Sequence, residues 1–187
     1  ICSHRWKQKH HADPDGEQLA VVKKHAEESE AEWFWIDYPC MPQEVRNENC
    51  EVTCPKTPKE RKYFGCALKN VNLLYLGGEV LILLDRGYSH RFWCHLESFL
   101  GMRTAAASGL VSSLHDPHHI IICMGTTAGK PEKWKSLLEE EMDLDMKDIL
   151  TFLASDDVDV TNKGDKEMMI EKMTGFEDLI RSLFAAP

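Results

Sequence analysis

The sequence lacks both a long apolar run and a cluster of basic residues. Its apolar runs span about five residues, far short of the roughly 20 that a membrane-spanning helix needs. The formal net charge is −9, so a phosphate backbone is a poor partner for this chain. No signal peptide is visible. We therefore expect a cytoplasmic protein that binds neither membranes nor nucleic acid.

The length and composition are those of an ordinary globular domain. The chain has 187 residues, of which 43% are hydrophobic and 28% are charged. This length suits one domain, 1–187, with a core of its own. Because the first residue is Ile1 rather than Met, we expect the chain to be a fragment of a longer protein.

Several motifs that would define a function are missing. Neither phosphate-binding loop, GxGxxG or GxxxxGK[ST], occurs, and there is no GxSxG nucleophile elbow. The seven cysteines are an odd set in a chain of a size that does not need a disulfide framework. Cys50 and Cys54 have zinc-like spacing but no clean second pair follows, and His115, His118 and His119 do not supply one. We therefore expect no metal and no disulfides.

What the sequence does contain is an alternation of apolar runs and amphipathic segments. Such alternation predicts a parallel sheet with helices on both faces. We expect about five strands in a three-layer α/β fold. The expected strands are 1–3, 33–36, 80–84, 119–124 and 158–160. The expected helices are 13–30, 57–77, 92–107, one from 134 and one from 165.

The remaining segments carry weaker signals. Residues 44–56 are polar and aperiodic, which predicts a mobile loop, and residues 108–117 also read as a loop. Residues 148–153 fit a short helix or a short strand equally well. The methionines of the last helix, such as Met169 and Met173, are more typical of core packing than of a partner site.

Glu97 is the strongest candidate for a reactive group. It follows the apolar strand 80–84 and lies one helical turn after Trp93. Open α/β sheets bind ligands at the carboxyl ends of their strands, so a carboxylate near that edge is a functional candidate. The alternative is a solvated helix glutamate, and spacing alone favours that alternative.

Three blocks of sequence in the same order resemble a known superfamily. Ser3-His-Arg-Trp6 closes the first strand, and Trp35-Ile-Asp-Tyr-Pro-Cys-Met-Pro-Gln43 resembles the W-I-D-x-x-C-x-x-Q block of fungal heterokaryon-incompatibility (HET) domains. Tyr88-x4-Trp93-Cys94-x2-Glu97 resembles the W-C-x-x-E block of Toll/interleukin-1 receptor (TIR) domains. The resemblance covers roughly residues 1–125. The loop after the second strand is longer than usual, and Cys40 and Gln43 have no settled role that transfers to this chain.

The resemblance implies a flavodoxin-like fold and one of two activities. TIR domains act as NAD+ hydrolases or as self-associating signalling modules in immunity and cell death. The hydrolase reading implies cleavage of the nicotinamide–ribose bond, giving nicotinamide and ADP-ribose or its cyclic form, with Glu97 as the catalytic residue. No cofactor is implied beyond NAD+ as substrate. The residues expected around the nucleotide are Ser3, His4, Arg5, Trp6, Asp37, Tyr38, Tyr88 and Trp93.

Each of these binding residues has an alternative role. Trp93 is at least as well explained as an anchor of its helix on the sheet. Arg5 has the option of pairing with Asp37 or Asp85 across neighbouring strand ends instead of with a phosphate. The two tyrosines, Tyr38 and Tyr88, fit half-buried packing positions.

Two further functions stay open beside the hydrolase. One is a non-catalytic module that self-associates through TIR-type contacts. The other is a domain that binds NAD+ or ADP-ribose without cleaving it. A single open cleft bordered by Glu97, Arg5, Trp6 and Asp37 would favour a nucleotide site, whereas an ion pair between Glu97 and a neighbouring arginine would favour the module.

Overall fold

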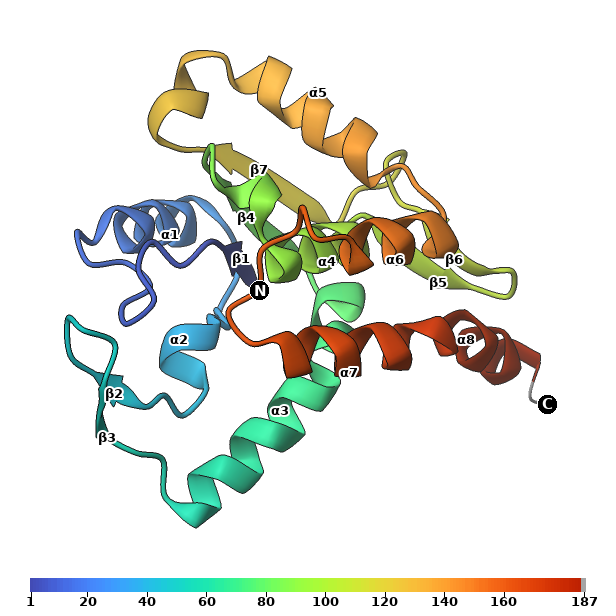
Figure 1. Ribbon diagram of the computed structural model, residues 1–187. Coiled ribbons are helices and arrows are strands. Elements are labelled where there is room, and N and C mark those ends of the chain that lie inside the picture. The colour runs from blue at the N-terminus through green and yellow to red at the C-terminus, as the bar shows by residue number, and fades with distance from the viewer. Residues whose placement is uncertain (186–187) are drawn as a thin grey trace.

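Three parallel strands form the centre of the molecule (Figure 1). The computed structural model describes residues 1–185. Strands β1 (Cys2–His4), β4 (Val80–Leu84) and β7 (His119–Cys123) lie in the order β1–β4–β7. Their register pairs Ser3 with Ile82 and Ile82 with Ile121. The chain is thus a mixed α/β protein with a parallel sheet flanked by helices, and its parallel strands number three among the described residues rather than the expected five.

Helices and two small hairpins surround this sheet. The helices are α1 (Glu17–Glu28), α2 (Asp37–Cys40), α3 (Pro58–Gly77), α4 (Phe92–Gly101), α5 (Pro131–Met142), α6 (Met146–Ala154), α7 (Lys163–Thr174) and α8 (Phe176–Ala185), with short 3-10 turns η1 (Tyr88–His90) and η2 (Gly125–Gly129). The antiparallel hairpins pair β2 (Val45–Arg46) with β3 (Val52–Cys54) and β5 (Arg103–Ala106) with β6 (Gly109–Ser112). Within residues 1–185, no helix combines the length and the apolarity needed to cross a membrane.

The core lies on both faces of the sheet because side chains alternate along β4. Ile82 and Leu84 pack into the larger cluster, which α3 to α8 cover. Leu81 and Leu83 pack on the opposite face with Val22 of α1. All five β4 side chains are buried, which explains why this strand is continuously apolar in sequence. Methionines of α7 belong to the larger cluster, so the prediction that they pack in the core is confirmed.

The expected second strand, 33–36, is an extended segment beside β1 rather than a strand of the sheet. One backbone hydrogen bond joins the two, from the Cys2 amide to the Trp35 carbonyl at 2.9 Å. A ladder does not form because β1 has only three residues and Trp33 projects into solvent with 89% of its surface exposed. The prediction of a strand here is wrong in hydrogen bonding but close in position.

The expected edge strand 158–160 lies away from the sheet. The Asp159 amide donates to the His90 carbonyl, and the Phe92 amide donates to the Asp159 carbonyl, each at 2.9 Å. These bonds fix the segment to the junction between η1 and α4. The prediction of a fifth sheet strand is therefore wrong, and the segment borders the start of α4 instead.

Helix boundaries follow capping chemistry closely. Thr57 accepts from the Glu60 amide while the Glu60 carboxylate accepts from the Thr57 amide, so the predicted capping box of α3 is confirmed. Helix α1 begins later than predicted, and Asp13 caps it by accepting from the Gln18 and Leu19 amides. The last predicted helix, expected from 165, is two helices, α7 and α8. The N-cap of α7 is Asn162, so α7 begins before the predicted start at Asp165.

Two segments predicted as loops form hairpins. The polar stretch 44–56 contains β2 and β3, and residues predicted as the end of a helix and a loop form β5 and β6. The β5–β6 hairpin packs against α8, which buries one side of it and explains its order. The ambiguous stretch 148–153 is helical within α6.

Candidate functional site

One open cleft of about 250 Å3 lies at the carboxyl end of the sheet. Five parts of the chain border it: the end of β1 and its loop, the segment around α2, the middle of α3, the start of α4, and the loop before α7. The four residues expected to border one cleft, Glu97, Arg5, Trp6 and Asp37, all line it. This position matches the rule that open α/β sheets bind ligands beyond the carboxyl ends of their strands.

Glu97 points into the cleft from α4 and is half-buried. Burial among apolar groups raises the pKa of its carboxyl to about 8, and the nearby Asp37 charge adds to this effect. The hydroxyls of Ser3 and Tyr75 and the charge of His4 lower the pKa but do not offset burial. No ion pair joins Glu97 to an arginine among residues 1–185. The carboxyl is thus held without a neutralising partner, as expected of a reactive group rather than a structural one.

Ser3 and Tyr88 support Glu97 from behind the cleft. The Ser3 hydroxyl donates to Glu97 Oε2 at 2.6 Å, and the Tyr88 hydroxyl lies 2.5 Å from the Ser3 hydroxyl. Because Ser3 gives its proton to Glu97, Tyr88 is the donor in the second bond. Both supporting residues are fully buried, and neither lines the cleft. Ser3 and Tyr88, which were predicted to lie around a nucleotide, are therefore outside the cleft lining, where they orient Glu97.

Asp37 is the hub of a second polar cluster. Its Oδ1 faces His4 Nε2 at 2.8 Å and accepts from the Tyr38 amide at 2.6 Å, while its Oδ2 accepts from Trp6 Nε1 at 2.8 Å. On the other side of the imidazole, Gln18 Oε1 lies 2.7 Å from His4 Nδ1. Both carboxylate oxygens are therefore occupied, which makes Asp37 a fixed part of the cleft rather than a free base.

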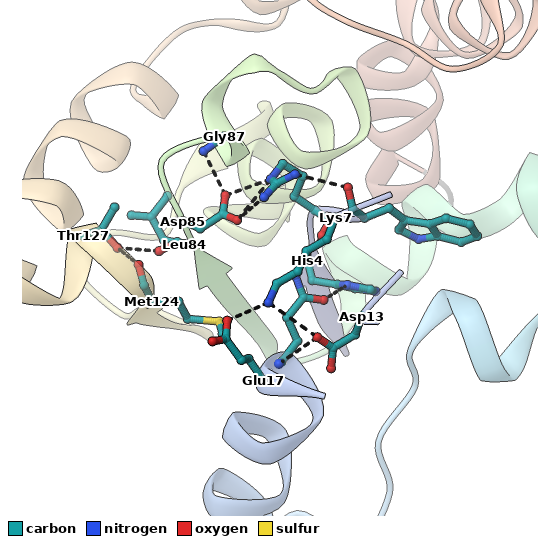
Figure 2. A network of polar contacts seen from close by, with 12 residues as sticks. His4, Lys7, Asp13, Glu17, Leu84, Asp85, Gly87, Met124 and Thr127 are labelled. Carbon is teal, nitrogen blue, oxygen red and sulfur yellow. Dashed lines mark hydrogen bonds and ion pairs between the residues drawn. The ribbon is translucent and has the colours of Figure 1, made fainter. Parts of the chain in front are cut away.

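Arg5 forms a bidentate ion pair with Asp85, the residue that follows β4. Its Nε and Nη2 donate to the carboxylate at 2.6–3.1 Å. Asp85 also accepts from the Gly87 amide, and a Cβ on Gly87 would lie 2.8 Å from Arg5 Nε, so glycine leaves room for the guanidinium (Figure 2). Of the two roles considered for Arg5, pairing with Asp85 is the one observed.

A separate charge cluster shapes the loop between β1 and α1. Lys7 Nζ lies 2.7 Å from Glu17 Oε2 and 3.8 Å from Asp13 Oδ1 (Figure 2). It also lies 2.6 Å from Asp15 Oδ1. This cluster holds Lys7 against the start of α1 and leaves Lys9, two residues later, on the cleft. The charges of this loop thus hold it in place, and Trp6 lies at the start of the loop, next to Lys7.

Indole rings line the cleft on several sides. Trp6 packs edge-on against Tyr38 with 5.2 Å between ring centroids, and Trp93 packs edge-on against Phe92 at 5.3 Å. Trp35 lies at the back of the cleft and contacts Tyr75. Trp93 thus both anchors its helix and lines the cleft, whereas Tyr38 does not line the cleft and supports the Trp6 ring from outside.

We call Glu97, His4, Asp37 and Arg5 the cleft base. The outer wall is the opposite side, formed by Phe64 and Leu68 of α3 together with residues 159–162 and 165.

Burial raises the pKa of Asp165, and the nearby amide of Asn162 and the charge of Lys56 oppose this effect. Two basic residues, Lys9 and Arg91, also line the cleft, and neither forms an ion pair among residues 1–185.

The outer wall is the part that sequence reasoning missed. Phe64, Leu68 and Val71 were expected only as the apolar face of a helix, and residues 158–160, which overlap the loop of the wall, were expected as an edge strand. Five of the eight predicted binding residues line the cleft: His4, Arg5, Trp6, Asp37 and Trp93. Gln43 also lines it and its amide lies 3.4 Å from the Asp37 carbonyl, whereas Cys40 lies in α2 outside the lining.

Other chemistries find less support in the geometry. Cys94 reaches the cleft wall, but burial and the nearby Glu97 charge raise the pKa of its thiol well above the usual value, which disfavours a thiolate nucleophile. All seven cysteines are free. Across residues 1–185, no three His, Cys, Asp or Glu side chains converge in a way that could hold a metal ion. The arrangement instead combines one poised carboxyl with aromatic rings.

Comparison of the chain with protein-family models, with curated proteins and with solved structures found no match.

Proposed function

We propose that this chain is a TIR-like NAD+ hydrolase built on a reduced flavodoxin-like sheet. The observation that carries the proposal is Glu97, a carboxyl without an ionic partner that faces an aromatic cleft at the carboxyl end of a parallel sheet. The reaction is NAD+ plus water giving nicotinamide, ADP-ribose and a proton. A cyclic product arises if the adenine of the same molecule attacks the ribose in place of water.

Groups in the cleft match two parts of this substrate, the pyridinium ring and the diphosphate. The indoles of Trp6 and Trp93 offer faces and edges to a cationic pyridinium ring. Arg91 and Lys9 are the cleft cations without an ionic partner in residues 1–185, and they suit the diphosphate. The first turn of α4 presents backbone amides on the same side, which adds to this anion preference.

The bond that breaks joins ribose C1′ to the pyridinium nitrogen. Its electron pair leaves with nicotinamide, which departs neutral and needs no protonation. Positive charge grows on the ribose, and the Glu97 carboxylate stabilises it while accepting hydrogen bonds from ribose hydroxyls. Water then bonds to C1′ and releases a proton to Glu97 or to solvent. One carboxylate suffices because the leaving group carries its own positive charge.

The reactive form of Glu97 is the ionised one, although burial favours the protonated form near neutral pH. A cationic substrate ring in the cleft adds a positive charge to that of His4, and so favours loss of the Glu97 proton on binding. Ser3, which donates to Glu97, keeps the carboxylate oriented after the proton leaves. This coupling makes the reaction faster at higher pH.

The test is nicotinamide release from NAD+ by the wild type, by Glu97→Gln and by the control Glu140→Gln, an exposed glutamate of α5. Assembly can be needed for activity in the resembled family, so protein concentration should be varied. We expect Glu97→Gln to lose at least about 100-fold in rate and the control to lose nothing. Equal background rates in all three proteins at high concentration would reject the enzyme, and calorimetry with ADP-ribose would then test binding without turnover.

A second candidate is a self-associating module, which one surface feature favours. Helix α8 buries Phe176 and Ile180 but exposes Leu179, Leu183 and Phe184 by 53%, 67% and 55%. Neighbouring exposed apolar residues on one helix suit a protein contact. Light scattering of the wild type and of Leu183→Glu tests this: concentration-dependent growth in mass that the variant abolishes supports the module, and a monomer at all concentrations opposes it.

A further inference from the structure

We propose that His4 is held as an imidazolium and acts as the positioning residue of the cleft, because it fixes the Asp37 carboxylate that in turn holds the Trp6 indole. A continuous chain of side chains, Gln18–His4–Asp37–Trp6, runs from the start of α1 to the cleft surface. The inference concerns the site itself; its consequence for turnover rests on the proposed function.

The protonation of His4 follows from what its two ring nitrogens face. The Gln18 amide nitrogen donates to the Arg5 carbonyl at 2.8 Å, which turns the Gln18 oxygen toward His4 Nδ1. The Asp37 carboxylate faces His4 Nε2. A neutral imidazole has one donor and one acceptor, so it would place a lone pair against one of these oxygens. Only the imidazolium donates to both.

The surroundings of His4 support the charged form. His4 is 8% exposed, and burial by itself disfavours its charge. Hydrogen bonding and attraction from Asp37, the bond to Gln18 and the charge of Glu97 outweigh burial and raise the pKa of His4. Asp37 comes from α2, Glu97 from α4 and Gln18 from α1, so the groups that face the ring lie on three separate elements.

The ring of Trp6 depends on this chain. Its Nε1 donates to Asp37 Oδ2 at 2.8 Å, and Tyr38 packs edge-on against it. Tyr38 is itself tied to Asp37 through its backbone amide and packs against His11. If His4 loses a proton, Asp37 keeps its charge but loses a charged donor, and both contacts of the indole loosen together. Trp6 should therefore be ordered below the His4 pKa and less ordered above it.

The first test needs no substitution. In the 15N-labelled wild type, the two His4 ring nitrogens report protonation and the indole N–H signal of Trp6, assigned with Trp6→Phe, reports its hydrogen bond. We expect both His4 nitrogens to be protonated at pH 6.5 and the Trp6 signal to move with the same midpoint as His4. A neutral single tautomer at pH 6.5, or a Trp6 signal indifferent to His4 titration, would overturn the proposal.

The second test uses variants that separate charge from donation. His4→Phe removes both donors and should shift the Trp6 signal toward that of a free indole, while His4→Gln keeps an amide donor for Asp37 and should restore part of the shift. The matched control is His115→Phe, at an exposed histidine outside the cleft lining. With NAD+, we expect His4→Phe to raise KM about tenfold, since a charge-assisted hydrogen bond is lost, with a smaller change in kcat.

The two proposals can fail separately. If no variant or wild-type protein releases nicotinamide, the nuclear magnetic resonance titration still decides the role of His4. If turnover is normal but the Trp6 signal ignores His4, the positioning role is rejected and the hydrolase stands. A folded His4→Phe protein with wild-type KM and an unmoved Trp6 signal would also reject it.

Discussion

The cleft base and the outer wall differ in how completely their polar groups are paired. In the base, Asp37 accepts three hydrogen bonds and Arg5 binds both oxygens of Asp85. On the outer wall, Asn162 is exposed and accepts one bond as the N-cap of α7, Asp159 is exposed, and Asp165 is half-buried without an ion pair in residues 1–185. One side of the cleft is therefore preorganised before any ligand arrives, and the other is free to contact a ligand.

This difference assigns separate tasks to the two sides. Fixed dipoles stabilise a developing charge without reorganising, which is what a bond-breaking site requires. Groups without internal partners gain most from a ligand because they give up few protein contacts when it binds. Glu97 is the exception within the base, because its hydrogen bonds and nearby charges do not offset the cost of burying its ionised carboxylate. Changes in the base should thus affect stability, and those at Glu97 should also affect kcat, whereas changes in the wall should affect KM with little loss of stability.

The largest difference in stability between the two sides of the cleft is expected at two aspartates. We expect Asp37→Asn to lower the free energy of unfolding by about 2–4 kcal/mol. The buried charge of His4 loses its carboxylate partner, and one of the donors that faced a carboxylate oxygen then faces the NH2 group of the new amide. Asp165→Asn, the matched change on the wall, should alter the free energy of unfolding by no more than about 0.5 kcal/mol, because burial opposes the charge that the helix N-terminus favours. Urea denaturation of both variants measures this, and equal losses would contradict the distinction.

The free energy of unfolding of Glu97→Gln should exceed that of the wild type by about 2–4 kcal/mol at pH 9, the pKa difference discounted for the partial exposure of the carboxyl. In the folded protein Glu97 keeps its proton up to a pKa of about 8, above its unfolded value of 4.5. The wild type therefore loses stability as pH rises from 4.5 to 8, and the amide does not. Thermal denaturation between pH 4 and 9 tests the sign. A variant less stable than the wild type at pH 9 would show that burial does not control Glu97.

Two arginines should show the same difference in stability between the base and the rest of the cleft, with a smaller effect. Arg5→Lys keeps the charge but loses the bidentate pairing with Asp85, and it should cost about 1–2 kcal/mol of unfolding free energy. Arg91→Lys alters a cleft cation that forms no ion pair in residues 1–185, so stability should stay within about 0.5 kcal/mol. Calorimetric melting of the pair decides this, and an Arg91→Lys loss as large as that of Arg5→Lys would count against it.

The smallest effect is expected on the apolar part of the outer wall. Phe64 is half-buried beneath Lys56, whose ammonium lies 4.1 Å from the ring centroid. Phe64→Leu keeps an apolar side chain and should raise KM for NAD+ about threefold while leaving kcat unchanged, as loss of uniform binding does. Steady-state kinetics measures the split. A drop in kcat with constant KM would place Phe64 with the base instead.

Sequence alone predicted much of the cleft base because its residues sit at the ends of strands and next to capping signals. The apolar run 80–84 is a local feature that placed Glu97 near the carboxyl end of a strand, and the resemblance of three sequence blocks added Arg5, Trp6 and Asp37, all of which line the same cleft. Burial state was harder to predict. Ser3 and Tyr88 are adjacent to the site in sequence but face the core, since neighbouring strand and helix residues point in different directions.

The outer wall and the strand count depend on contacts between distant parts of the chain. Residue 64 and residues 159–162 meet at the cleft only because backbone bonds between Asp159 and the start of α4 bring them there. Those same bonds remove the predicted fifth strand from the sheet. The second predicted strand failed because β1 is too short to pair with it. The local periodicity of the sequence therefore predicts neither the composition of the outer wall nor the number of strands in the sheet.

The most direct test of Glu97 as a poised catalytic carboxyl is the pH dependence of nicotinamide release. We expect kcat/KM of the wild type to rise with pH and to level off with an apparent pKa near 8, since catalysis needs the ionised form of a buried carboxyl. Glu97→Gln should stay at background throughout. A wild-type rate that is independent of pH between 6 and 9, or one that the variant matches, would contradict the account.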